Sequence, residues 1–207
     1  MSIKIAVLLS GSGTTLQNII DCCASGAIDG EVVCVVSSRA DAYGLTRADN
    51  SSIPNTAVLR KEHENADTFS QAIWDFVNPH EPDLIVLAGF MSLLNVPSRY
   101  DGRIMNVHPA LIPAFCGKGM YGHHVHKAVI AYGAKLSGVT VHFVDGEYDN
   151  GPIIMQSTVE VKEDDTPDIL AERVQAEERA IYPKAVQLFA EGRLKLDGRI
   201  VYILPKN

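Results

Sequence analysis

The start of the chain places the strongest constraint on its fold. Residues 3–9 (IKIAVLL) are rich in β-branched side chains, and they stop at the glycine turn of residues 10–13 (SGSG). After this turn, apolar residues recur at the i, i+3, i+4 and i+7 positions of an amphipathic helix, as Leu16, Ile19, Ile20 and Cys23. A strand, a glycine turn and a helix in this order predict the first part of a βαβ unit.

Similar segments alternate through the first half of the chain. Residues 31–37 predict a strand that is buried on both faces, because its apolar side chains do not alternate with polar ones, and residues 84–88 predict a third strong strand. Residues 67–77 have helical spacing, and residues 103–107 predict a further strand. Strands that alternate with helices predict a parallel sheet with helices on both faces.

The second half of the chain has a different pattern. Residues 138–144 alternate apolar and polar side chains, and residues 152–161 follow a turn as the expected antiparallel hairpin partner. Thr166 is a hydroxyl cap before a proline at the first helical position, which predicts a long helix to about residue 190. Residues 199–204 predict an added edge strand.

Length and composition fit these elements into one domain. The 207 residues are 46% hydrophobic and carry 18 basic against 25 acidic side chains, which gives a formal net charge of −7. We therefore expect an α/β fold with a single Rossmann-like domain over residues 1–207. It would contain a mostly parallel twisted sheet, helices on both faces and a C-terminal antiparallel hairpin.

Composition also disfavours several classes of partner. The acidic balance argues against a general nucleic-acid-binding protein, which needs a clustered basic face. The longest apolar run, residues 84–91, is far shorter than the roughly 20 residues of a membrane span. Four cysteines without a CxxC pair predict reduced thiols in a cytoplasmic protein. We expect no nucleic-acid partner and no membrane partner.

The glycine turn is a candidate anion site. It lies between a strand and a helix, where backbone N–H groups and the helix dipole favour anions, and the hydroxyls of Thr14 and Thr15 follow Gly13. The dinucleotide spacing GxGxxG is not met, because Leu16 stands three residues after Gly13, and the Gly-Lys-Ser/Thr of a P-loop is missing. A tight turn without a ligand is the alternative interpretation.

Asn106 and His108 are candidate catalytic residues. They fall at the end of a predicted buried strand, where open α/β sheets bind ligands, and their i and i+2 positions share a face. An amide donor beside an imidazole suits oxyanion stabilisation and proton transfer near neutral pH. Asp145, Glu147 and Asp149, in a later turn, each offer a carboxylate that can pair with His108. A histidine with purely structural contacts is the alternative.

Two other polar features are less specific. His123, His124 and His126 have the spacing i, i+1, i+3, which is not the HExxH pattern, so no metal site is predicted. Glu178 falls on the apolar stripe of the long predicted helix. Its carboxylate lies either at the rim of the core or opposite a polar ligand.

Together these segments resemble the folate-dependent formyltransferases along nearly the whole chain. The matching segments are LLSGSGTTLQNII, LIVLAGFMSLL, RIMNVHPALIP, SGVTVHFVDGEYDNGPII and RVQAEERAIYP. The opening turn and the RVQxxExxxYP helix are typical of the branch whose acceptor is glycinamide ribonucleotide. The chain departs from that branch at Thr14-Thr15, where serine and asparagine are usual, and at Ala66 and Ser92, where arginine often helps to hold folate.

The resemblance implies two substrates, glycinamide ribonucleotide and the co-substrate 10-formyltetrahydrofolate, with no metal or redox cofactor. It assigns ribonucleotide binding to Gly13, Thr14, Thr15, Gln175 and Glu178. It assigns folate binding to Met91, Ser92, Leu93, Leu94, Asn106, Asp145 and Asp149. The implied catalytic set is Asn106, His108 and Asp149.

The implied reaction is formyl transfer to the glycinamide amine in purine synthesis, by direct attack of the amine. Asn106 and a protonated His108 would stabilise the oxyanion, and Asp149 would favour the imidazolium form. Related enzymes that formylate methionyl-tRNA or hydrolyse formyl-folate share this core but normally carry a further domain. A non-catalytic nucleotide- or folate-binding module and a Rossmann dehydrogenase are the remaining alternatives. The chain is expected to be a monomer or a homodimer.

Overall fold

The computed structural model describes residues 2–206, which form two compact units that divide after Met105. A seven-stranded sheet has the strand order β3-β2-β1-β4-β5-β6-β7, and β8 and β9 form a separate two-stranded sheet. The predicted α/β fold class, with a mostly parallel sheet and a C-terminal antiparallel hairpin, is confirmed. The expectation of a single domain stays a prediction.

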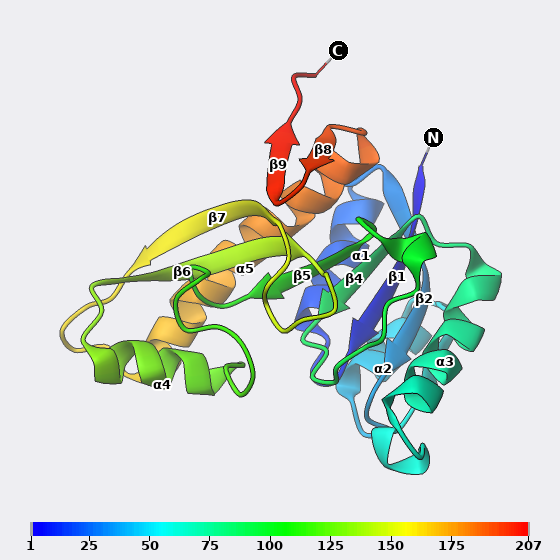
Figure 1. Cartoon of the computed structure of the whole chain (residues 1–207), viewed down its shortest axis with the longest axis horizontal. Helices are drawn as coiled ribbons and strands as arrows, with labels where there is room; N and C mark the ends of the chain where they lie inside the picture. The colour runs from blue at the N-terminus through cyan, green and yellow to red at the C-terminus, as the bar shows by residue number, and fades with distance from the viewer. Residues whose placement is uncertain (1, 207) are drawn as a thin grey trace. The chain divides into compact units, whose positions relative to one another are not determined.

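The first unit contains parallel strands joined by helices (Figure 1). The strands β2 and β4 flank β1, and β3 pairs with β2, all in parallel. The bounds of these elements are β1 Ile3–Leu9, α1 Thr14–Ala24, β2 Gly30–Ser37, α2 Tyr43–Asn50, β3 Asn55–Ala57, α3 Ala66–Val77 and β4 Leu84–Ala88, with short 3-10 turns at Arg60–Glu62, Asn78–His80 and Ser98–Tyr100. The strand β5, Ile104–His108, crosses the division between the units.

The order of these strands reverses at β1. The chain moves outward from β1 to β3 and then returns to the other side of β1 as β4. With right-handed connections, this reversal puts α3 on the opposite face from α1 and α2. Ligands of open α/β sheets bind beyond the carboxyl ends of the strands at such a reversal.

One buried hydroxyl links three strand ends at this point. Ser10 follows β1, and its Oγ accepts a hydrogen bond from the backbone N–H of Met91, beyond β4, over 3.0 Å. The same Oγ lies 2.6 Å from Oγ of Ser38, the residue after β2. The glycine turn and the segment that starts at Met91 are therefore tied to each other.

The second unit is built on an antiparallel pair of strands. The strands β6 (Leu136–Phe143) and β7 (Ile153–Glu160) pair with Leu136 opposite Glu160. The helix α5 (Pro167–Ala190) packs on both strands and on α4 (His123–Tyr132), as Figure 1 shows. The buried core between these elements contains Ala110, Val125, Val129, Val139, Val159, Leu170 and Val174.

The long helix begins as its sequence predicts. Thr166 caps it by accepting a hydrogen bond from the N–H of Ile169, and Pro167 occupies the first helical position, where no backbone donor is needed. Pro183 lies inside this helix, and it is buried.

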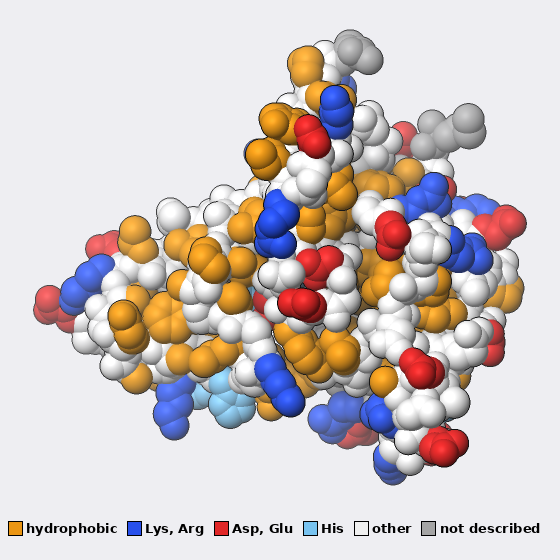
Figure 2. Space-filling view, in the orientation of Figure 1, with side chains coloured by type: hydrophobic (Ala, Val, Ile, Leu, Met, Phe, Trp, Pro, Cys, Tyr) orange, Lys and Arg blue, Asp and Glu red, His pale blue; other side chains and the backbone are white. Residues whose placement is uncertain are grey.

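A strand lies within residues 199–204, as the sequence predicts, and it belongs to the separate two-stranded sheet. The strand β9 (Ile200–Ile203) pairs only with β8 (Leu194–Asp197) among the described strands. Figure 2 shows hydrophobic side chains on this hairpin, where the exposed ones are Leu196, Ile200, Tyr202 and Ile203. Within the described part of the chain, no helix is long and apolar enough to cross a membrane.

Candidate active site

Two side chains at the end of β5 contact the same carboxylate. Nδ1 of His108 lies 3.3 Å from Oδ2 of Asp149, and Nδ2 of Asn106 donates to Oδ1 of Asp149 over 3.4 Å. Asn106 and His108 meet the carboxylate together because alternate residues of a strand share a face. The side chains of His108 and Asp149 are only 3% and 11% exposed, so water screens this pair weakly.

Both ring nitrogens of His108 face oxygen atoms. Its second ring nitrogen, Nε2, lies 2.8 Å from the carbonyl oxygen of Phe115. A carbonyl and a carboxylate only accept hydrogen bonds, so both ring nitrogens of His108 must donate. The geometry therefore fits an imidazolium ion beside the Asp149 carboxylate.

A second histidine orients the amide of Asn106. Nδ1 of His142 donates to the carbonyl oxygen of Phe143 over 2.7 Å, which leaves Nε2 to accept from Nδ2 of Asn106 over 3.2 Å. Burial lowers the pKa of His142 and so favours its neutral form. The amide of Asn106 cannot be reversed, because its oxygen would then face both Nε2 and the Asp149 carboxylate.

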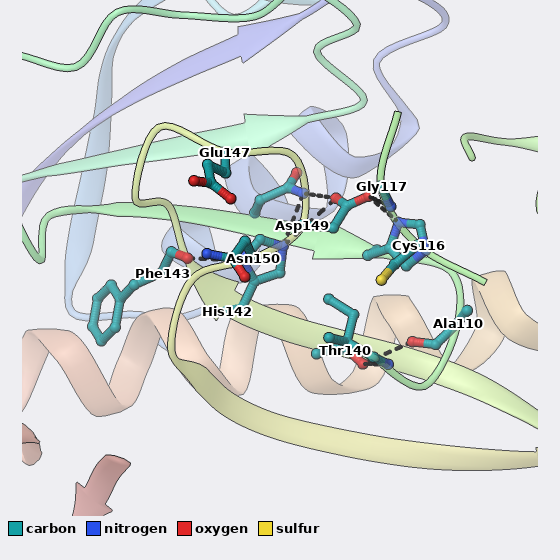
Figure 3. Close-up of polar contacts among 12 residues, drawn as sticks. Ala110, Cys116, Gly117, Thr140, His142, Phe143, Glu147, Asp149 and Asn150 are labelled. Atoms are coloured by element: carbon teal, nitrogen blue, oxygen red, sulfur yellow. Dashed lines mark hydrogen bonds and ion pairs between the residues drawn. The ribbon is translucent and has the colours of Figure 1, made fainter. Parts of the chain in front are cut away.

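The loop around Asp149 is held from two sides. The backbone N–H of Gly117 donates to Oδ2 of Asp149 over 3.0 Å, and Figure 3 shows Asp149 between Gly117 and His142. A Cβ atom at Gly151 would lie 1.7 Å from the carbonyl oxygen of Phe143, so only glycine fits there. Asp149 itself has a left-handed backbone with φ of 52°.

Asp145 shapes the same loop. Its Oδ1 accepts from the N–H of Glu147 over 3.2 Å, and its Oδ2 accepts from the side chain of Asn150 over 2.8 Å. Of the three carboxylates that could pair with His108, Asp149 is the one in contact. Glu147 is exposed.

A buried threonine holds the segment that follows His108. Oγ1 of Thr140 donates to the carbonyl of Ala110 over 2.7 Å and accepts from the N–H of Ile112 over 3.1 Å (Figure 3). Gln156 donates to the same Oγ1 and to the carbonyl of Ile112. These bonds fix the chain between β5 and the loop that reaches Phe115 and Gly117.

The histidines of α4 have different surroundings in the described part of the chain. Among the residues that the structure describes, no group of three His, Cys, Asp or Glu side chains is placed to hold a metal ion. His123 pairs with Asp168 over 3.1 Å, whereas His126 is 3% exposed and its Nδ1 has no hydrogen-bond partner within residues 2–206. Burial, followed by the charges of His123 and His108, lowers the pKa of His126 from 6.5 to about 4.

Cys116 lies in the loop between Phe115 and Gly117. Its Sγ donates to the carbonyl of Pro113 over 3.2 Å. Burial and the nearby charge of Asp149 raise the pKa of this thiol. The thiol is therefore kept protonated, which argues against a nucleophilic role.

The candidate anion site lies in the first unit. Gly13 has φ of 71° and caps α1, whose first turn consists of uncharged residues. Gly13 is buried, Thr14 is exposed and Thr15 is half-buried. Beyond β4, the predicted folate-contacting residues differ in exposure, with Met91 and Leu93 exposed, Ser92 half-buried and Leu94 buried.

The remaining predicted site residues lie on α5. Gln175 is exposed and Glu178 is half-buried. Sequence reasoning missed His142 and the backbone groups of Phe115 and Gly117. Of these, only His142 had a signal, since it stands in the alternating segment 138–144 on the same face as Thr140.

Comparisons with known proteins give a consistent result. The family model described as formyl transferase matches residues 3–186. Phosphoribosylglycinamide formyltransferase of Haemophilus influenzae is 41% identical, over 99% of this chain and 97% of that protein. The Escherichia coli protein of the same name is 39% identical, over 97% and 93%. The crystal structure of glycinamide ribonucleotide transformylase 1 from Symbiobacterium toebii has a TM-score of 0.93 and 43% identity, over 99% and 95% of the two chains.

Proposed function

Because the chain belongs to the formyl transferase family, we propose that it transfers the formyl group of 10-formyltetrahydrofolate to the amine of glycinamide ribonucleotide, a step of purine biosynthesis. The observation that carries this proposal is the contact of Asn106 and His108 with the Asp149 carboxylate, at 3.4 and 3.3 Å. The amide of Asn106 and the imidazolium of His108 lie beside the same carboxylate, and their N–H groups are two donors for an oxyanion.

In the proposed reaction, the neutral amine attacks the formyl carbon that is bound to N10 of the folate. A new C–N bond forms and the formyl oxygen becomes negative, and donors placed at that oxygen lower the barrier. The bond from carbon to N10 then breaks. The proton that the amine loses reaches N10 through His108, so atoms and charge balance.

The geometry of His108 separates the roles of its two nitrogens. Nδ1 faces Asp149, so Nε2 is the nitrogen that serves the substrate. The formyl oxygen would replace the carbonyl of Phe115 as the acceptor of this N–H. The formyl oxygen would likewise replace Asp149 as an acceptor of the Asn106 amide, because the bond to Asp149 is longer than the bond to His142.

We assign binding roles to the other predicted residues within the same proposal. Gly13, Thr14 and Thr15 would bind the phosphate of the ribonucleotide, and Gln175 and Glu178 would bind its ribose and glycinamide parts. The folate would contact residues 91–94 and the loop that Asp145 shapes. The bonds from Asp145 to Glu147 and Asn150 support a role in shaping that loop.

The proposed mechanism uses neither a metal nor a redox cofactor. We propose that the protein acts in the cytoplasm on small molecules, without a nucleic-acid partner, as a monomer or a homodimer. The net charge of −7 supports the expectation about nucleic acids, because phosphate backbones repel an acidic surface.

An absorbance assay for deformylation of a 10-formylfolate analogue tests the function. With glycinamide ribonucleotide present, the assay should report turnover that is absent without it. Turnover without the ribonucleotide would instead indicate a hydrolase, and no turnover under either condition would leave a binding module.

A further inference from the structure

The helix α2 packs directly on the candidate anion turn. A Cβ atom at Gly13 would lie 2.5 Å from Cα of Gly44, and one at Gly44 would lie 2.5 Å from Leu9. Two glycines therefore face each other where the first turn of α2 meets the turn before α1. This contact brings the backbone and side chains of α2 within hydrogen-bonding distance of the turn.

Three consecutive carbonyl oxygens of the turn accept hydrogen bonds. The carbonyl of Gly11 accepts from the N–H of Gly44 over 3.1 Å, and that of Gly13 accepts from the N–H of Gln17 over 2.9 Å. Between them, the carbonyl of Ser12 accepts from Nε of Arg47 over 2.9 Å. Each carbonyl that could repel an anion is thus held by a donor, and two of the three donors belong to α2.

The guanidinium of Arg47 is fixed by further contacts. Its Nη1 donates to Oε1 of Gln17, in the first turn of α1, over 3.3 Å. Its Cζ lies 5.1 Å from the centre of the Tyr43 ring, a cation–π distance. Its stem is also in place, since Cδ lies 3.2 Å from the position of a Cβ at Gly13. A permanent positive charge is therefore held against the backbone of the turn.

We propose that Arg47 is a positioning residue for the phosphate of the acceptor. It holds the Ser12 carbonyl away from the anion and adds a positive charge behind the turn. This inference rests on the proposed function, in which the turn binds the ribonucleotide phosphate. It explains why α2, with only eight residues, carries an arginine whose donors point at the turn.

Binding of inorganic phosphate tests the inference without any formyl transfer. Arg47→Met keeps the apolar stem against Gly13 but removes the charge and the donors, and it should raise the Kd for phosphate about tenfold, as measured by calorimetry. Arg47→Lys keeps the positive charge, so its Kd for phosphate should rise less than that of Arg47→Met. Arg103→Met is the matched control, because Arg103 is exposed in the same unit and precedes β5. Phosphate binding by Arg47→Met that equals that of the unsubstituted protein would overturn the inference.

Kinetics separate a phosphate-specific role from a general packing role. Arg47→Met should raise KM for glycinamide ribonucleotide about tenfold, with kcat and the KM for folate within about twofold. With glycinamide riboside, which lacks the phosphate, KM should stay within about twofold. An equal rise for both acceptors would mean that Arg47 only supports the fold, and would contradict the inference.

Two further results complete the test. If thermal unfolding shows that Arg47→Met does not fold, Arg47→Lys decides, since its smaller rise in KM must be confined to the phosphorylated acceptor. If the unsubstituted protein transfers no formyl group, the proposed function fails. Phosphate binding that still depends on Arg47 would then leave the role of Arg47 at the turn supported.

Discussion

Nδ2 of Asn106 donates to Nε2 of His142 over 3.2 Å, so one histidine orients the amide that lies beside the other histidine, His108. The bond works in one direction only, because Nδ1 of His142 already donates to the carbonyl of Phe143. A neutral, buried His142 is thus an obligate acceptor at Nε2. The direction in which Asn106 presents its N–H groups follows from the tautomer of a residue outside the implied catalytic set.

Replacing the acceptor at His142 should therefore impair catalysis. His142→Phe removes the acceptor while keeping a buried ring, and we expect kcat to fall about tenfold to a hundredfold, the usual cost of one lost buried hydrogen bond. His142→Gln, which retains an acceptor oxygen, should recover part of the rate. Steady-state kinetics at saturating substrates measure both. A normal kcat in His142→Phe would remove His142 from the orientation of Asn106.

Substitution of the His108–Asp149 pair should affect turnover more than binding. His108→Ala and Asp149→Asn should each lower kcat by about 10²–10³-fold, because each would remove or weaken the proposed oxyanion donor. The Kd for glycinamide ribonucleotide, measured by calorimetry, should change little. A rate like that of the unsubstituted protein in either variant would exclude that residue from the mechanism.

The loop that carries Asp149 should not tolerate a side chain at Gly151. Gly151→Ala places a Cβ atom 1.7 Å from the carbonyl oxygen of Phe143, which must displace the loop. We expect a loss of about 2–3 kcal/mol in the free energy of unfolding, together with a fall in kcat. Gly146→Ala is the control in the same loop, since its Cβ meets nothing within 4 Å. Gly146→Ala should lower the free energy of unfolding by only about 1 kcal/mol, because Gly146 has a φ of 92°.

Acid should destabilise the protein partly through His126. Its pKa in the folded protein, about 4, lies below the ordinary value of 6.5, so below pH 6.5 the unfolded chain binds a proton that the folded protein does not. The free energy of unfolding should thus decrease as the pH falls from about 6.5 to about 4, and be unaffected by this residue above that range.

The variant His126→Met should flatten that decrease, as measured by the thermal unfolding temperature at several pH values. His124→Gln is the control, because His124 is exposed on the same helix. An identical pH dependence in the unsubstituted protein and in His126→Met would show that His126 does not contribute.

The elements that sequence predicted well have strong local signals. The strands β1, β2 and β4 each contain an apolar run of five residues, and α5 begins at a hydroxyl cap followed by proline. The helix α2 was missed because its sequence, YGLTRADN, is short and contains few large apolar residues. In the structure it packs against the glycine turn. The strand expected at 199–204 is present as β9, but its partner β8 could not be predicted, because apolar alternation does not identify a partner strand.

The sequence predicted the side chains of the candidate site but not the loop geometry or the backbone contacts that complete it. Asn106 and His108 share a face by strand periodicity, so their proximity followed from the sequence. The choice of Asp149 over Asp145 and Glu147 depends on loop geometry, including the close approach of Gly151 to Phe143. His108 contacts the backbone carbonyl of Phe115, and Asp149 contacts the backbone N–H of Gly117. Residue types do not indicate such contacts, because nearly all residues carry the same backbone groups.

The hydroxyl of Ser10 gives the two proposed substrates a means of thermodynamic coupling. The turn proposed to bind phosphate and the segment proposed to contact folate share its Oγ through the N–H of Met91. If ordering of one segment orders the other, each substrate raises the affinity for the other by the same factor. Ser10→Ala should reduce that factor to about one, measured as the ratio of ribonucleotide Kd values without and with a non-reactive folate analogue. An unchanged ratio would show that the coupling does not depend on Ser10. A reduced ratio would show that, through this serine, binding of one substrate raises the affinity of the site for the other.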